Sequence, residues 1–241
     1  MAAPLRIALT ALAWAAVGVI YLPLLPAGLI IISPALHLNS WLTLLADAQL
    51  PGALLATLVS TAVALTGALA IAMFTIAALW PSRRWQRLVS RLPLLLALPH
   101  VAFAAAALLL FAEGGWLFRL FPVLTAPQDR YGIGLGAVLA VKESAFLLWA
   151  AYALLDERSL RQQCLVLRSQ GYGRWQCLLW LIAPRLLPQM SIVLLATLAW
   201  TLSAVDVAIV IGPGNPPTLA VLAAQWLSAG DDAQQAQGAL A

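Results

Sequence analysis

Apolar residues occur along this chain in long runs that short polar stretches separate. Crossing about 30 Å of hydrocarbon takes about 20 residues of helix, and five runs reach that length. No run shows the period-two alternation of a membrane β-strand, so each is predicted to be a helix. The pattern therefore predicts an all-α, polytopic transmembrane helix bundle, with spans at about 7–32, 51–80, 92–111, 131–155 and 187–211.

Composition supports the membrane as the solvent of this chain. Of its 241 residues, 63% are hydrophobic and 9% are charged, and the mean hydropathy is +0.94. Soluble domains carry about 25% charged residues, so a water-soluble fold and a disordered chain are both excluded. The net charge of +4 comes from scattered arginines, and no nucleic acid is expected as a partner. The first run is longer than the apolar part of a signal peptide, so we expect it to be retained.

Motifs for catalysis, metal binding or nucleotide binding are missing from the sequence. It contains no HExxH, GxxxxGK[ST] or GxSxG. Cys164 and Cys177 lack CxxC spacing, and on one cytoplasmic loop we expect them to be reduced and inert. We therefore expect no catalytic residue, no metal, no cofactor and no enzyme activity in this chain.

Arginine placement predicts the orientation in the membrane. Lysine and arginine accumulate in cytoplasmic loops, and one side of the predicted bundle holds nearly all of them: Arg6, Arg83, Arg84, Arg87, Arg91, Arg158, Arg161, Arg168, Arg174 and Arg185. The N-terminus and the loops 81–91 and 156–186 are therefore predicted to be cytoplasmic. The loops 33–50 and 112–130, with only Arg119 and Arg130, and the tail after Gly212 would face outward.

Two spans carry small residues at every fourth position: Ala64, Ala68 and Ala72 in one, and Gly132, Gly136 and Ala140 in the other. Such stripes let helix backbones approach closely in lipid. The alternative is that an alanine-rich chain yields this spacing by chance.

The predicted cytoplasmic loop 156–186 has the most specific pattern. Helical periodicity continues to about Gln170, where Gly171 and Gly173 interrupt it with Tyr172 between them. A short amphipathic segment follows from 174 to about 182, and Pro184 is expected to end it. Because glycine adopts the left-handed conformation of a sharp turn, we predict a helix–turn–helix lying against the membrane. The alternative is an ordinary juxtamembrane loop with a surface helix.

This loop resembles the EAA loop of the membrane subunits of binding-protein-dependent ABC importers, which have the type I permease fold. Gly171 and Pro184 stand thirteen positions apart, as the conserved glycine and proline do in that family, and Leu181 takes the place of its isoleucine. Arg168, Ser169 and Trp175 also match residues frequent there. The chain departs from the pattern at 165–167, where Leu-Val-Leu replaces Glu-Ala-Ala.

Further stretches resemble the same family. They are Ala56–Ala72, similar to its opening span; Lys142–Leu148, similar to a KE-x-PFLL stretch with Ala145 in place of proline; and Ser203–Val207, similar to a serine-to-acid motif. The resemblance covers about 52–225. It implies a permease subunit whose cytoplasmic loop fits a groove on a separate ATP-binding subunit, with contacts from Gly171, Tyr172, Arg174 and Trp175.

The resemblance also implies partners and a location. They are a dimer of cytoplasmic ATP-binding subunits, a second permease unit, an extracytoplasmic substrate-binding protein and the lipid of a bacterial inner membrane. The turn at 212–217 is predicted to be rigid and exposed, either as a contact for the binding protein or as a simple loop. A helix from 218 to 228 is expected to follow it, with Thr218 as its N-cap. Family members import thiamine, ferric iron, polyamines or oxyanions, and no residue selects among them.

Three ionisable residues fall within predicted spans: Lys142, Glu143 and Asp206. Charges in hydrocarbon normally face protein or water and have a partner. Lys142 and Glu143 point about 100° apart on a helix, so they are not expected to share a groove. Two hypotheses remain open, in which one of these residues lines the translocation pathway near Asp206, or Lys142 and Asp206 form a structural ion pair.

For domain organisation, we expect an N-terminal span and outer loop at 1–50, followed by a permease-type domain at 51–241. A sixth span is expected to start near the C-terminal end, which makes the second domain incomplete and the chain either a truncated permease or the first part of a longer one. The competing functional class is a secondary transporter or channel subunit, which would show inverted repeats and broken helices. An intramembrane enzyme lacks support from any catalytic spacing.

Overall fold

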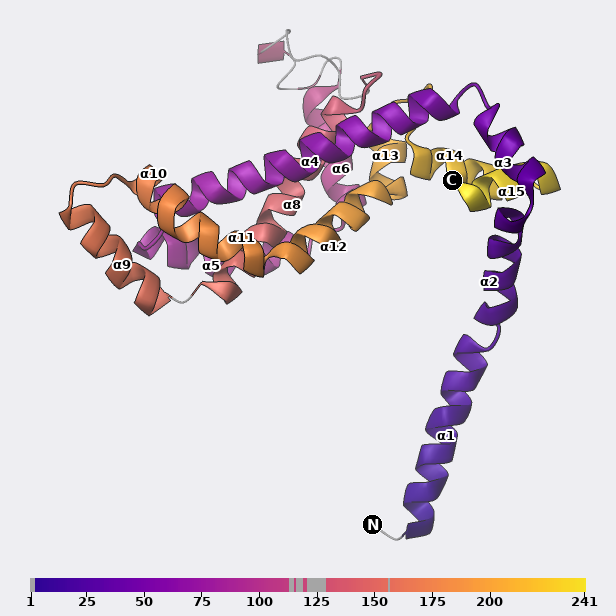
Figure 1. The fold of residues 1–241 in the computed structure, drawn as a ribbon, viewed down its shortest axis with the longest axis horizontal. Helices are drawn as coiled ribbons and strands as arrows, with labels where there is room; N and C mark the ends of the chain where they lie inside the picture. Colours follow the sequence, from indigo (N-terminus) through magenta and orange to yellow (C-terminus); the bar gives the residue numbers. More distant parts are fainter. Residues whose placement is uncertain (1–2, 113–114, 116–118, 121–128, 156) are drawn as a thin grey trace. The chain divides into compact units, whose positions relative to one another are not determined.

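A computed structural model describes residues 3–112, 115, 119–120, 129–155 and 157–241. Every regular element in these ranges is helical, which confirms the all-α prediction (Figure 1). Asp156 and most of the predicted outer loop 112–130 lie outside the described residues. The chain divides into two compact units, one of residues 1–50 and 222–241 and one of residues 51–221.

The first unit joins the N-terminal helices to the C-terminal one. It contains α1 (Ala3–Tyr21), α2 (Leu24–Ile32), the 3₁₀ turn η1 (Ser33–Leu36), α3 (Leu38–Leu45) and α15 (Asp232–Leu240). The Asp231 carboxylate accepts a hydrogen bond from the Gln234 N–H and so begins α15. Because α15 packs on α2, η1 and α3, residues 222–241 group with the N-terminal segment rather than with the domain predicted at 51–241.

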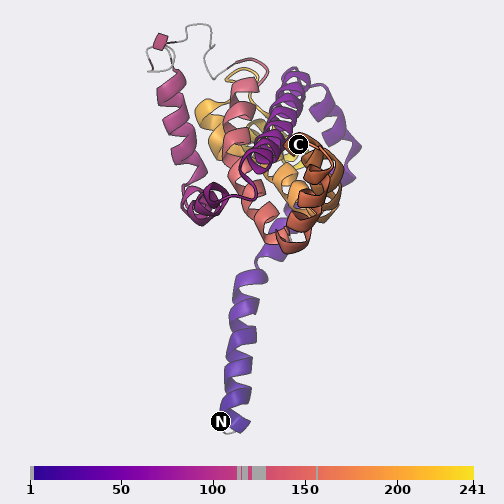
Figure 2. The same ribbon diagram turned by 90° about the vertical axis from the view of Figure 1, so that its left-hand side faces the viewer.

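The second unit holds α4 (Leu50–Leu79), α5 (Arg83–Leu96), α6 (His100–Phe111), α8 (Ile133–Leu154), α9 (Glu157–Ser169), α10 (Arg174–Cys177), the π-helical turn η2 (Leu178–Ile182), α11 (Ala183–Gln189), α12 (Ser191–Leu202) and α13 (Val205–Ile211). Figure 2 shows α8 between α4 and α6. A further helix, α14 (Leu219–Leu227), crosses the boundary between the two units.

The small-residue stripe of α8 packs closely against α4. Ala64, Ala68 and Ala72 are fully buried. A Cβ on Gly136 would lie 2.6 Å from the Ser60 carbonyl oxygen, and one on Gly67 would lie 2.8 Å from the Ala140 Cβ. Such approaches are possible only for small residues, so the α8 stripe forms a helix interface, while the α4 stripe is buried beside it.

Three helices in the described residues are long and apolar enough to span a membrane: Leu5–Leu36, Leu50–Leu79 and Ile133–Leu154. The other two predicted spans are broken, and counting each broken pair as one span gives five. The prediction of one continuous helix at 92–111 is wrong, because α5 and α6 meet there at a bend of 100° around Pro99. The expected helix at 187–211 is also wrong, because it bends by 67° after Gln189 and stops again at Ser203.

The segment after α13 confirms the predicted turn but corrects its details. Residues 212–217 form no helix, yet Gly212, Pro213 and Pro217 are buried rather than exposed. The predicted helix is α14, but Thr218 does not cap it, since its buried hydroxyl has no partner among the described residues. The Thr57 hydroxyl of α4 accepts the hydrogen bond from the Leu219 N–H instead, at 2.8 Å.

Candidate functional site

Two features of the second unit are candidates for function. The first is the elbow, by which we mean α9, the turn at 170–173 and α10. The turn closes α9 with the two hydrogen bonds of a Schellman motif: the Tyr172 N–H donates to the Leu167 carbonyl, and the Gly171 N–H donates to the Arg168 carbonyl, each at 3.1 Å. Gly171 has φ +91°, a conformation that strongly favours glycine. The predicted glycine turn is therefore confirmed.

The helix after the turn is longer than predicted. The Gly173 N–H donates to the Gln176 side-chain oxygen at 2.7 Å, which starts α10. The helical path then continues through η2 into α11 and does not end at Pro184, which is the second residue of α11. The wide π turn of η2 ends two residues before Pro184, in the turn where a normal α-helical bond would need the N–H that proline lacks.

The elbow is braced against α4 by two of the predicted ATPase-contact residues. The Arg174 guanidinium donates to the Ala78 carbonyl at 3.1 Å, and the Trp175 ring meets the Phe74 ring edge-on at a centroid distance of 4.9 Å. Trp175 and Tyr172 are nevertheless about half exposed, and no atom lies within 4 Å of a Cβ placed on Gly171. The turn therefore presents an open surface on a fixed support.

The remaining predicted loop residues have local roles. The Ser169 hydroxyl donates to the Val166 carbonyl at 2.7 Å, and Arg168 lies in the last turn of α9, where a cation is favourable. Cys164 and Cys177 are free thiols buried inside the elbow. Burial, and then the neighbouring Cys177, raise the pKa of the Cys164 thiol to about 11. A thiol with so high a pKa forms little thiolate, the reactive species, near neutral pH.

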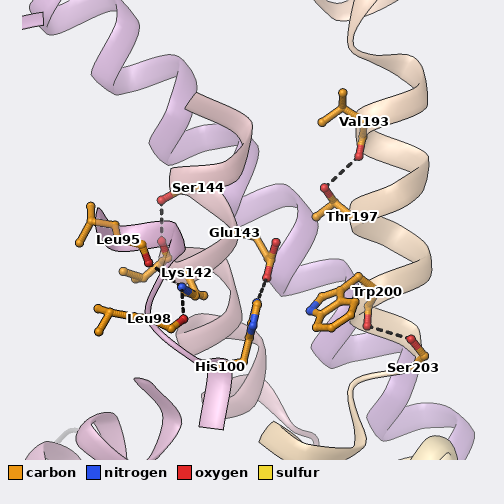
Figure 3. Close-up of polar contacts among 11 residues, drawn as sticks. Leu95, Leu98, His100, Lys142, Glu143, Ser144, Val193, Thr197, Trp200 and Ser203 are labelled. Carbon is orange, nitrogen blue, oxygen red and sulfur yellow. Dashed lines mark hydrogen bonds and ion pairs between the residues drawn. The ribbon is translucent and has the colours of Figure 1, made fainter. Parts of the chain in front are cut away.

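The second feature is the polar cluster, which we define as His100, Lys142, Glu143, Thr197 and Trp200. Figure 3 shows the Lys142 ammonium at the break between α5 and α6. It donates to the carbonyls of Leu95 and Leu98 at 2.7 and 2.8 Å. The Leu95 carbonyl lies in the last turn of α5, and the Leu98 carbonyl lies two residues beyond its end, where the helix carries negative partial charge. Lys142 therefore stabilises the bend.

Glu143 faces a different partner on the same bend. Its carboxylate lies 3.0 Å from the His100 Nε2 at the start of α6, and the His100 ring centroid lies 5.0 Å from that of Trp200 on α12 (Figure 3). A cavity of about 270 Å³ opens beside them, and both Lys142 and Glu143 line it. The expectation that these neighbours cannot share a groove is thus wrong, because the chain folds back over α8 at the bend.

Asp206 is not part of this cluster. It is exposed in the first turn of α13, and it forms no ion pair with any of the described residues. The hypothesis of a Lys142–Asp206 ion pair is therefore wrong, since two backbone carbonyls already satisfy the ammonium. His100 and Trp200 were missed by the sequence reasoning. One sequence feature could have pointed to His100: it is an ionisable residue next to a proline within an apolar run.

Comparison with known proteins bears on both features. No protein-family model matches the chain. Over all 241 residues, the chain is 62% identical to the inner membrane ABC transporter permease protein YnjC of Escherichia coli strain K12. The resemblance to ABC transporter permeases is confirmed. The chain spans 47% of the length of YnjC, so the comparison covers the elbow and the polar cluster but only about half of that relative.

Proposed function

We propose that this chain is a membrane-spanning permease subunit of an ABC importer, which forms the substrate translocation pathway and couples to a separate ATP-binding subunit. The observation that carries the proposal is the elbow, an open turn closed by Gly171 and braced on α4 by Arg174 and Trp175. Similarity to YnjC along the whole chain supports the transporter class. ATP hydrolysis is assigned to the partner, because the chain has no phosphate-binding loop motif.

The packing provides a mechanical path from the turn to the membrane helices. A push on Tyr172 would reach α4 through the contacts of Arg174 and Trp175 with its last turns. The close interface of α4 with α8 would then carry the movement to the polar cluster. Closely packed helices of this kind move as rigid bodies between discrete arrangements. ATP drives the switch only as far as the ATP-binding subunit prefers one arrangement.

The proposal includes a location and further partners. YnjC is named as an inner membrane protein, and we assign this chain to the bacterial inner membrane as a multi-pass protein with a cytoplasmic N-terminus. The arginine-rich elbow then faces the cytoplasm, where a dimer of ATP-binding subunits would dock. A second permease unit and an extracytoplasmic substrate-binding protein complete the complex.

Within this complex, the polar cluster is the proposed contact with the translocation pathway. Buried ionisable groups in a membrane protein mark substrate or ion paths. Glu143 and His100 line a cavity, whereas Lys142 has a structural role at the bend. Asp206, exposed on α13, remains a second candidate for the pathway.

The broken helices favour one competing function, a secondary transporter or channel subunit. Discontinuous helices that bring ionisable groups together are typical of secondary transporters, and α5 and α6 form such a pair. Such a protein would work without an ATP-binding partner. The elbow is the feature that this alternative leaves unexplained.

Gly171→Val tests the proposed function. A β-branched residue at φ +91° strains the turn by about 1–3 kcal/mol, which should distort the docking surface while the helices stay intact. The measurement is the amount of P-loop ATPase, identified by mass spectrometry, that copurifies with the tagged full-length chain from its native host. We expect at least a tenfold loss, as about 1.4 kcal/mol of lost binding would produce.

Gly230→Val is the matched control. Gly230 also has a positive φ, +75°, and open space around its Cβ position, but it lies outside the elbow. It should retain the ATPase at the parent level. Undiminished ATPase with Gly171→Val, or no ATPase with the parent chain, would contradict the proposal, and the second result would favour the secondary transporter.

A further inference from the structure

A cavity of about 210 Å³ lies between the C-terminal end of α4 and the elbow. Three arginines line it: Arg161 and Arg168 from α9, and Arg174 from α10. No aspartate or glutamate is found among the described residues around it. Guanidinium groups stay charged at all ordinary pH values, so three positive charges gather in a space large enough for one small anionic group.

Several hydrogen-bond donors line this cavity. The Arg174 guanidinium donates to the Ala78 carbonyl, which engages only part of its five-donor fork. Trp80 also lines the cavity, and its Nε1 is buried without a hydrogen-bond partner among the described residues. Arginine forks and an unpaired indole N–H both require acceptors. A phosphate group supplies several acceptor oxygens together with the negative charge that balances the arginines.

The position of the cavity identifies the source of that phosphate. It lies at the end of a 30-residue apolar helix, where Trp80 directly follows Leu79. Tryptophan and arginine at the end of a span are typical of the headgroup layer. Ile76, Leu165 and Ile182 add apolar walls to the same cavity. A mixed lining of this kind fits a headgroup with its attached chain better than a free ion.

We propose that this cavity binds the phosphate group of an acidic phospholipid, which would neutralise the three arginines and join α4 to α9. The site is distinct from the open turn at Gly171. It requires membrane lipid but no ATP-binding subunit, so loss of the ATPase contact would leave lipid binding unchanged.

The test uses the full chain in nanodiscs of phosphatidylcholine with 20% phosphatidylglycerol (about one lipid in five). Native mass spectrometry measures how much phosphatidylglycerol remains bound after release from the disc. Arg161→Gln with Arg168→Gln should lower its retention by at least about tenfold, because two charge-assisted contacts are lost. Arg84→Gln with Arg87→Gln removes two exposed arginines of α5 and should leave retention unchanged.

A second pair of variants covers the case in which the glutamine double variant does not fold. Arg161→Lys with Arg168→Lys keeps both charges but loses the bidentate fork, so retention should fall severalfold. Competition with inorganic phosphate separates the two sources of the group. A lipid site keeps phosphatidylglycerol at about 10 mM phosphate. Displacement by phosphate, or equal retention in the α9 and α5 variants, would overturn the proposal.

Discussion

In the elbow, the hydrogen bonds that close the turn join residues no more than five positions apart, such as Tyr172 and Leu167. In the polar cluster, the bonds to Lys142 and Glu143 join residues 43 to 47 positions apart. The turn was found as predicted, whereas the partners of the buried charges were not. A hydrogen bond between residues close together in the chain can be predicted from the sequence. A hydrogen bond to a residue more than 40 positions away cannot.

The largest expected effect comes from Lys142→Met. It removes the two hydrogen bonds that the buried ammonium donates to the Leu95 and Leu98 carbonyls and should destabilise the fold by about 3–5 kcal/mol, since each bond from a charged group is worth about 1.5–3 kcal/mol. Thermal unfolding in detergent measures the loss.

Ser144→Ala is the matched control for Lys142→Met. Its hydroxyl is equally buried but bonds only the Val141 carbonyl within α8, so it should cost less than about 1 kcal/mol. Equal losses of stability in the two variants would show that the long-range contacts of Lys142 contribute no more than the local contact of Ser144.

A smaller effect is expected for Trp175→Ala, which removes the long-range brace of the elbow. The edge-on contact with Phe74 is worth about 0.5–1.5 kcal/mol. Trp180→Ala, at a tryptophan of η2 that is 78% exposed, should change stability far less. Unfolding free energies of the two variants, measured side by side, show whether the elbow depends on α4. A larger loss of stability in Trp180→Ala than in Trp175→Ala would contradict the role of Trp175 as the brace.

The effect that is smallest at neutral pH concerns the pH dependence of Cys164. Burial raises the pKa of its thiol from 9.0 to about 11. The folded chain therefore holds this proton more tightly than the unfolded chain, so the stability it contributes is complete below pH 9 and is lost as the pH rises toward 11. Comparing the parent with Cys164→Ala at pH 8 and at pH 10.5 isolates this contribution. A parent chain that gains stability relative to Cys164→Ala over this range would contradict it.

Several features followed from the sequence alone. The apolar runs predicted helices because the backbone must pair within itself in lipid. The stripes at Ala64–Ala72 and Gly132–Ala140 predicted close approaches between helices, without saying which helices meet, and Gly171 predicted the turn of the elbow. Each rests on a property that a residue carries with it, namely its size, its apolar surface or its backbone freedom.

Other features were decided only by the tertiary structure. The sequence around Pro99 did not reveal a bend of 100°, because Lys142, which donates to the Leu95 and Leu98 carbonyls there, lies 44 to 47 positions away in the chain. Nor could Thr218 be rejected as a cap before Thr57 was seen to bond the Leu219 N–H. A buried polar group must find a partner somewhere, but only the folded chain determines which distant residue comes within reach.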